Sequence, residues 1–583
     1  MKFRKKNNLF GQSSGRHARW LVLASGLFFF VYLYLYFGVP GGVAGRGQNQ
    51  PQHLIFNQPD ESVNYFFIRR FALEGEFGYP EPLAQVSRSQ VHPRSTTVVD
   101  GRVVPIGFPG MILLFGLAAR AAVALFGPAA FNLAVVSLTP LAAVIMPWFL
   151  FGALRRIFND RLAFISALLA YILPPWWYYA SRPLQHNTLF VTCVVAFIYL
   201  LTRLWDKRQE ERQWPVAALA GLAYGLCVYV RPAEAVWLTV GALVATVLSR
   251  KFLKPGNIAA AALALCFLGA VFFMTQTAYY GHPFGTGYAR PAASGAAGLV
   301  FSGPQGLSFA QAIFLPFGWH PAAMLKTAYQ YVFRLFPAWF MVALVGLMLS
   351  PLGVMAKLPL SGSRQDFSAL ICRDVRQLRV RFYTLGFALL GVYLLAFYGS
   401  WSFSDNLAGL ASVGSSQTRY FLPLYVLALP FGALVIDGLR RLATVGKLAA
   451  ALIAAALLLT SAKSVFVSFE GLIMVRGNVE TYYDWRGRII ESTEPDAVLV
   501  THYADKYLFP VRKVIPDWKT DEELGALQAL VLSGEPLYWY DLAVTAEAET
   551  RLRSAFSGYG LRLSAPVAGW DSLELRRIEP EES

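Results

Sequence analysis

Residues 21–39 read LVLASGLFFFVYLYLYFGV, an apolar run that directly follows the basic start MKFRKKNNLFGQSSGRHARW. A run of this length crosses the hydrocarbon core of a bilayer as a helix. The run is long and aromatic, and it shows no small-residue cleavage site, which favours an uncleaved first helix over a signal peptide. Residues 1–19 are therefore expected to form a basic tail in the cytoplasm.

The rest of the chain has a composition that is typical of a membrane protein. Of its 583 residues, 56% are hydrophobic and 15% are charged, and the mean hydropathy is +0.44. A soluble globular protein carries about 25% charged residues. We therefore expect a polytopic α-helical membrane protein, with a transmembrane domain at 20–468 and a polar domain at 469–583.

Twelve apolar segments are long enough to be considered as spans, and one of them, 104–126, is not expected to cross the membrane. The segments lie at 20–39, 104–126, 130–153, 162–180, 188–204, 215–230, 234–249, 257–279, 328–355, 382–399, 419–438 and 447–468. If 104–126 is re-entrant or lies along the outer face, 25 of the 51 Lys and Arg residues fall in the cytoplasmic tail and loops. That distribution satisfies the positive-inside rule. The sequence thus predicts about 11 transmembrane helices, with the N-terminus inside and the C-terminus outside.

The net charge of +16 does not indicate nucleic-acid binding, because so many of the basic residues lie in these short loops. The polar part after the last apolar segment alternates strand-like and helix-like runs. Strands are predicted at 497–501, 536–540 and 572–577, and helices at 521–532 and 545–556. We expect a small external α/β domain there.

The stretch NQPDESVNYFFIRRFALEGEFGY, residues 57–79, lies in the first external loop, 40–103. It predicts a short helix that Asp60 or Asn57 caps and Gly75 ends. Its apolar face, expected on the membrane or against other helices, consists of Val63, Phe66, Phe67 and Phe71. Adjacent carboxylates near a membrane surface are rarely kept without a use. The alternative is that Asp60 is only a helix cap.

Further motifs follow the Asp60-Glu61 pair in a fixed order. They are PIGFPG (105–110), PPWWYYASRPLQHN (174–187), RPAE (231–234), YYGHPFGTGY (279–288) and RYFLPLY (419–425). Over roughly residues 20–440 the chain resembles the GT-C glycosyltransferases, among them protein O-mannosyltransferases, aminoarabinose transferases and oligosaccharyltransferases. It departs from the oligosaccharyltransferases at His186 and Asn187, where acidic residues are expected, which argues against a two-carboxylate metal site.

The resemblance implies a multi-pass enzyme of the plasma (inner) membrane. Such an enzyme transfers a sugar from a polyprenyl-phosphate donor to a glycan, lipid or protein acceptor on the external face. The resemblance implies no certain cofactor and leaves a divalent metal open. A transporter or flippase of lipid-linked sugars is the alternative, since it also explains many spans and external arginines.

The chemistry needs a base for the acceptor and cations for the leaving phosphate. Asp60 is the candidate base. Glu61 is expected to hold the acceptor, help a metal or tune the neighbouring carboxylate. The candidate phosphate ligands are Arg182, Arg231, Arg334 and Arg419; the alternative for each is snorkelling to the interface. The candidate sugar or acceptor contacts are His186, Tyr288 and Trp177, although Trp177 also fits an interfacial aromatic belt.

Overall fold

The structure is a computed structural model. It describes residues 8–37, 53–204, 213–248, 254–285, 287, 289–291, 299–301, 314–350, 367–401, 410–543, 546–570 and 572–581. The chain divides into two compact units. The first, here called the helical unit, comprises 1–35, 137–270 and 303–474; the second, the mixed unit, comprises 36–136, 271–302 and 475–583.

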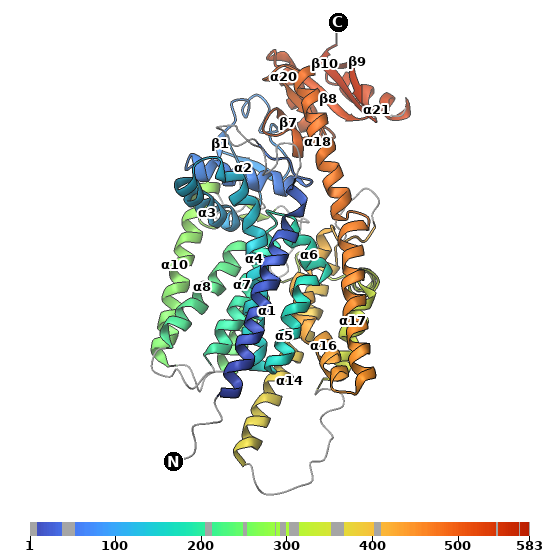
Figure 1. Cartoon of the computed structure of the whole chain (residues 1–583). Coiled ribbons are helices and arrows are strands. Elements are labelled where there is room, and N and C mark those ends of the chain that lie inside the picture. The colour runs from blue at the N-terminus through green and yellow to red at the C-terminus, as the bar shows by residue number, and fades with distance from the viewer. Residues whose placement is uncertain are drawn as a thin grey trace. The chain divides into compact units, whose positions relative to one another are not determined.

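The helical unit is built from helices that lie in it wholly or in part, and several of them are long and apolar (Figure 1). The helices are α1 (Asn8–Tyr32), η1 (Leu33–Tyr36), α4 (Ala130–Ile157), α5 (Asp160–Ile172), α6 (Pro174–Ser181), α7 (His186–Arg203), α8 (Trp214–Val230), η3 (Pro232–Glu234), α9 (Ala235–Leu248), α10 (Pro255–Tyr280), α12 (Pro321–Thr327), η4 (Ala328–Arg334), α13 (Pro337–Met348), α14 (Phe367–Gly399), α15 (Ser416–Tyr420), α16 (Leu422–Arg440), α17 (Thr444–Ala462), η6 (Lys463–Val467) and α18 (Leu472–Ser492). The expected polytopic helical architecture is confirmed.

Within the described residues, seven helices are long and apolar enough to cross a membrane, and three bent pairs raise the count to ten. The prediction of about 11 counts 215–230 and 234–249 as separate spans, whereas the structure has Trp214–Val230 and Pro232–Val244 as one pair bent by 118°. The bend falls at Arg231, because Pro232 offers no N–H to continue the helix. α3 (Gly110–Phe126), inside the exceptional segment 104–126, is shorter than the span candidates; its place at the outer face stays a prediction.

Close helix packing in the helical unit depends on small residues. α13 packs against α16, and α7 packs against α8. A Cβ added at Gly346 on α13 would lie 1.9 Å from the carbonyl oxygen of Phe431 on α16. Only glycine permits this approach of the two backbones.

The mixed unit begins with α2 (Pro59–Leu73), which packs against α3. A small antiparallel sheet of order β1-β3-β2 follows, from β1 (Tyr79–Pro80), β2 (Thr96–Val99) and β3 (Arg102–Pro105). The strands β4 (Ala289–Pro291) and β5 (Leu299–Phe301) pair in a second small sheet.

The C-terminal part of the mixed unit is a five-stranded sheet of order β7-β6-β8-β10-β9. Its elements are β6 (Val498–Val500), α19 (Asp505–Leu508), β7 (Lys513–Ile515), α20 (Asp521–Leu532), β8 (Leu537–Leu542), α21 (Ala546–Ser557), β9 (Leu561–Trp570) and β10 (Leu573–Pro580). β6 runs parallel to β7 and β8, whereas β8, β10 and β9 are antiparallel neighbours. The predicted strands and helices of this α/β part are confirmed, and β7, β9 and α19 are additional.

The first loop and the C-terminal part share one hydrophobic core. Leu83 and Val91 from the loop lie in the same buried cluster as Val498 and Trp539 of the five-stranded sheet. The sequence predicts 469–583 as a domain of its own. In the structure residues 475–583 belong to one compact unit with the first loop, and 469–474 belong to the helical unit.

The ends of α2 explain its place in the loop. Gln58 is the N-cap, and its backbone N–H donates to the Glu61 carboxylate at 3.1 Å. The predicted caps, Asp60 and Asn57, are therefore wrong: Pro59 fits the first helical position, which shifts the cap to the residue before it. Gly75 ends the helix as predicted, with a left-handed φ of +78°.

Candidate functional site

Asp60 lies in the first turn of α2 and is partly buried. The Ser95 hydroxyl donates a hydrogen bond of 2.5 Å to its Oδ1 atom. Ser95 comes directly before β2, in the same loop. Ser95, which lies outside α2, thus holds the Asp60 carboxylate. A residue that only caps a helix does not need such a partner.

Glu61 is fully buried, with 0% of its surface exposed. Its carboxylate accepts from the backbone N–H of Gln58 and so closes the N-terminal turn of α2. This contact adds a structural use to the roles expected of Glu61 in acceptor or metal binding, which stay predictions.

The apolar face of α2 packs against protein within the mixed unit. Val63 and Phe67 are buried, and the Phe66 ring lies 4.6 Å from that of Phe509 near the C-terminal sheet. Phe71 lies against Gly116 of α3, where an added Cβ would come within 2.5 Å of the ring. The expectation of packing against other helices is met at α3, and the C-terminal part supplies a partner that the pattern alone did not indicate.

The bend between α8 and α9 holds a buried polar network around Arg231. Its guanidinium lies 3.1 Å from the Glu234 carboxylate and donates to the Tyr398 hydroxyl at 3.0 Å. Tyr398 in turn donates to Glu234 at 2.7 Å, and Trp237 donates to the other carboxylate oxygen at 2.6 Å. The RPAE motif therefore forms a fixed turn whose charge pair is satisfied.

Arg419 lies beside this network. The guanidinium carbons of Arg231 and Arg419 are 4.9 Å and 5.4 Å from the centroid of the Tyr420 ring. That ring also stacks on Tyr398, with centroids 4.5 Å apart. Arg419 donates to Gln185 Oε1 and to Ser416 Oγ, both at 2.8 Å and both neutral. Two of the four predicted arginines thus gather on one aromatic ring.

Arg182 is almost fully buried and lies in the same region of the helical unit. It donates to the Tyr178 hydroxyl at 2.8 Å, and the adjacent Tyr179 donates to the carbonyl of Ser415 at 2.9 Å. The segment that starts at Ser415 carries Arg419, so this contact connects the surroundings of the two arginines. A buried guanidinium that donates to a neutral hydroxyl is suited to an anionic ligand.

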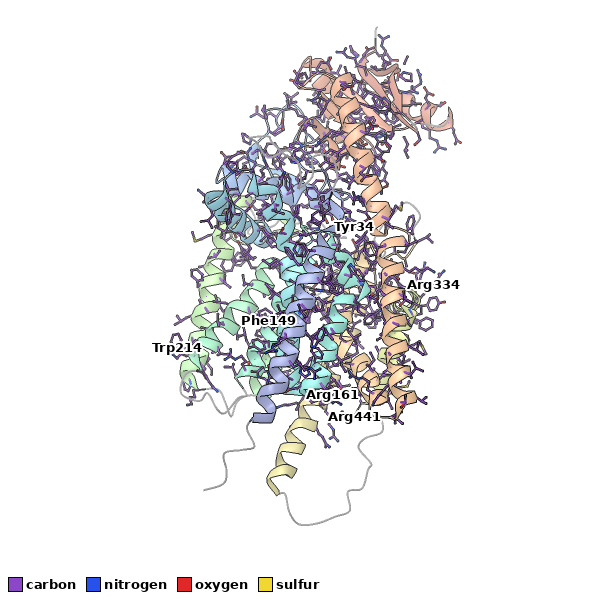
Figure 2. The ribbon with its side chains drawn as sticks, viewed as in Figure 1. Tyr34, Phe149, Arg161, Trp214, Arg334 and Arg441 are labelled. Atoms are coloured by element: carbon purple, nitrogen blue, oxygen red, sulfur yellow. The ribbon has the colours of Figure 1, made fainter. Side chains whose placement is uncertain are left out.

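The remaining predicted residues do not all join this group. Arg334 is exposed on η4, at the edge of the helical unit in the view of Figure 2. Trp177 is buried against Phe28 and Phe466, in edge-to-face contacts of 5.7 Å and 5.5 Å. His186 is partly buried at the start of α7, four residues after Arg182 in the sequence. The remaining candidate, Tyr288, lies outside the described residues.

A cavity of about 300 Å³ opens in the mixed unit beside α2. The rings of Phe66, Tyr79 and Phe509 form one wall, and Glu81 and Lys513 supply charge. Burial raises the pKa of Glu81, an effect that the hydrogen bond from the backbone of Leu83 and the charge of Lys513 partly oppose. The size of the cavity and its mixture of apolar and charged lining residues are typical of a small-molecule site.

Metal ligands do not converge in the described part of the chain: no three His, Cys, Asp or Glu side chains gather there as a metal site would require. The residues that sequence reasoning missed are Ser95, which donates to Asp60, and the ion pair of Arg94 and Asp505, which joins the residue before Ser95 to α19. Hydroxyls and ion pairs of this kind leave no periodic signal in a sequence.

Comparisons with known proteins bear on the fold. A family model described as dolichyl-phosphate-mannose-protein mannosyltransferase matches residues 112–273. A comparison with curated protein sequences gives no match. Among solved structures, ArnT from Cupriavidus metallidurans in the apo state is similar at 11% identity and a TM-score of 0.52, covering 96% of this chain and 98% of that chain.

Two further structures resemble the chain less closely. ArnT bound to undecaprenyl phosphate gives 12% identity and a TM-score of 0.48, covering 96% of this chain and 97% of that chain. The oligosaccharyltransferase AglB from Archaeoglobus fulgidus, in complex with an inhibitory peptide and a dolichol-phosphate, gives 11% and 0.48, covering 90% and 69%. The partial family match and the ArnT-like fold together confirm the expected resemblance of this chain to the GT-C membrane glycosyltransferases.

Proposed function

We propose that the chain is a glycosyltransferase that moves a sugar from a polyprenyl-phosphate donor to an acceptor on the external face of the membrane. The observation that carries the proposal is the grouping of Arg419 and of Arg231, which also pairs with Glu234, around the Tyr420 ring, with Arg182 nearby. Guanidinium groups bind phosphate oxygens in a planar, two-pronged geometry. They also stabilise the charge that a leaving phosphate develops.

Asp60 is the proposed base. An acceptor hydroxyl or amine attacks the anomeric carbon while its proton passes to the Asp60 carboxylate. The bond between that carbon and the phosphate oxygen breaks, and polyprenyl phosphate leaves with the bonding electrons. One displacement of this kind inverts the anomeric centre. The hydrogen bond from Ser95 supports the assignment, because it fixes the orientation of the carboxylate before the substrate arrives.

The comparisons support the choice of donor. The matching family is described as using dolichyl-phosphate-mannose, and ArnT, whose apo structure shares this fold, has also been solved with undecaprenyl phosphate. We therefore propose a polyprenyl-phosphate-linked hexose or pentose as the donor. The acceptor classes are those of the sequence analysis: a glycan, a lipid or a protein.

The experiment is transfer or hydrolysis of radiolabelled polyprenyl-phosphate sugars by purified protein. Asp60→Asn is expected to lower the rate by about 10²–10⁴-fold, the usual contribution of general base catalysis. Asp100→Asn is the matched control, because this exposed aspartate lies in the same loop at φ +49°, where asparagine fits equally well. Full activity of a folded Asp60→Asn protein would remove Asp60 as the base.

A transporter of lipid-linked sugars is the second candidate. The bent pairs favour it, above all the 118° bend at Arg231, since discontinuous helices often bind transported substrates. Reconstituted vesicles with a fluorescent polyprenyl-phosphate sugar separate the two functions. Movement of the intact donor across the bilayer without cleavage would support transport, whereas cleavage that requires Asp60 would support transfer.

A further inference from the structure

Asp505 is a carboxylate with no surface exposed, at the start of α19 in the C-terminal part of the mixed unit. Burying a charge without a partner is costly, so a side chain of this kind normally has a fixed set of donors. Its donors come from the first loop, 411 residues earlier in the sequence. The two segments are therefore joined at a defined point.

Arg94 supplies these donors. Its backbone N–H donates to Oδ2 of Asp505 at 2.9 Å, and its Nε and NH2 groups donate to Oδ1 at 3.0 Å and 2.5 Å. The guanidinium also donates to the carbonyl of Tyr503 at 3.3 Å and lies 5.3 Å from the centroid of its ring. Both the backbone and the side chain of Arg94 are thus fixed on α19.

The next residue, Ser95, contacts the proposed base. Its backbone has a left-handed φ of +64°, which is costly for a residue other than glycine and persists only where the surroundings enforce it. Its hydroxyl donates to Oδ1 of Asp60, and its carbonyl accepts from the backbone N–H of Ile106 at 2.9 Å. The contacts of Arg94 on one side and of Ile106 on the other hold this conformation.

A second contact joins α19 to the first turn of α2, which carries Asp60. The Ser62 hydroxyl donates to the carbonyl of Lys506 at 2.7 Å. Ser62 lies two residues after Asp60, and Lys506 directly follows Asp505. Adjacent residues of α19 therefore hold both the helix that carries the base and the loop that carries its hydrogen-bond donor.

We propose that Asp505 and Arg94 are positioning residues for Asp60, so that the C-terminal part of the chain is required for the proton transfer of the reaction. The inference rests on the proposed function, in which Asp60 is the base. The ion pair of Arg94 and Asp505 sets the position of Ser95, and Ser95 orients the Asp60 carboxylate. A displacement of about 1 Å at a reacting group costs as much as about a hundredfold in rate.

The test is the transfer assay on Asp505→Asn, Ser95→Ala and the double variant. Asp505→Asn is expected to lower kcat about ten- to a hundredfold, with the KM for the donor unchanged. Asp505→Glu, which keeps the charge, is expected to recover part of the rate. Because the two residues act in series, the double variant should be scarcely slower than the slower single variant.

The pH–rate profile gives a readout that a loss of stability would not move. Loss of the Ser95 hydroxyl removes a donor to the charged carboxylate, so the acid limb should shift to higher pH in Ser95→Ala. Asp505→Asn should shift that limb in the same direction. An unmoved limb in both variants would overturn the inference.

Glu549→Gln is the matched control, because it breaks an ion pair of 2.9 Å with buried Arg576 in the same C-terminal part, a pair that is separate from the contacts of Arg94 and Ser95. An equal loss of kcat in this control would show that the effect is general destabilisation. Hydrogen exchange at 60–64 and 94–97 should rise in Asp505→Asn and stay unchanged in Glu549→Gln; equal protection in both variants would overturn the inference. This measurement needs no activity, so its failure is distinguishable from failure of the proposed function, which an inactive wild type would indicate.

Discussion

His53 is expected to make the mixed unit sensitive to acid. Its ring packs edge-on against Tyr65, with centroids 4.9 Å apart, and lies near Phe66. Burial, together with the charges of Arg486 and Arg69, lowers the pKa of His53 from 6.5 to about 3. The folded unit thus keeps a neutral ring at a pH where the unfolded chain would bind a proton.

The sign and size of the effect follow from linkage. Because the pKa is lower in the folded state, the stability due to the neutral ring is present above pH 6.5 and is lost as the pH falls toward 3. At pH 5, which lies about 1.5 units below the ordinary pKa of histidine, His53 is protonated in the unfolded chain. Relative to pH 7.5, this proton binding stabilises the unfolded state by about 2 kcal/mol. That loss is a large part of the stability of an ordinary domain.

Hydrogen exchange of the amides in 54–68 measures the effect at the two pH values, after correction for the intrinsic exchange rates. His53→Phe keeps an aromatic ring at the site but does not titrate. The variant is expected to lose about 2 kcal/mol less than the wild type between pH 7.5 and pH 5. His282→Gln, a change at an exposed histidine of the same unit, should behave as the wild type does. If His53→Phe and the wild type lose equal stability, the reasoning is refuted.

Three further changes test packing and charge. Gly346→Ala should destabilise the helical unit by about 1–3 kcal/mol, because the added Cβ would meet the carbonyl of Phe431. Gly386→Ala is the control and should not destabilise it, because an added Cβ there meets no atom within 4 Å. Thermal unfolding in detergent compares the two variants. Glu81→Gln should stabilise the mixed unit more at pH 8 than at pH 4, because the raised pKa of this carboxyl makes its ionisation costly in the folded state, and urea unfolding at both values measures this. Glu234→Gln should lower the stability of the folded protein by about 3–5 kcal/mol, since it leaves the buried guanidinium of Arg231 without its carboxylate partner. An unchanged melting temperature would contradict this prediction.

Local patterns in the sequence predict the elements of the structure well. The helix from Asp521 follows from its acidic first turn and capping residue, and the end of α2 follows from Gly75. The segment 104–126 differs from the spans because Pro and Gly interrupt its start, and the structure has a shorter helix there. These features depend on neighbours within a few residues, which a single sequence contains.

Contacts between distant segments could not be predicted in this way. Leu83 and Val91 are apolar residues in a polar loop, and nothing near them indicates that they complete a core with strands some 400 residues later. The pairing of Arg94 with Asp505 is equally invisible, because either charge alone fits a solvated surface. Its place in an apolar run predicts that Arg334 joins the other arginines, yet the helix turns its side chain outward.

The contact between Arg94 and Asp505 also has a consequence for the biosynthesis of the protein. A ribosome that adds about 5–20 residues per second needs about 20–80 s to make the 411 residues between them. During that time the first loop is already made, but the residues that hold it have not been synthesised. The nascent chain therefore carries Asp60 without its final surroundings, and these form only when the last fifth of the protein has been translated and has joined the loop.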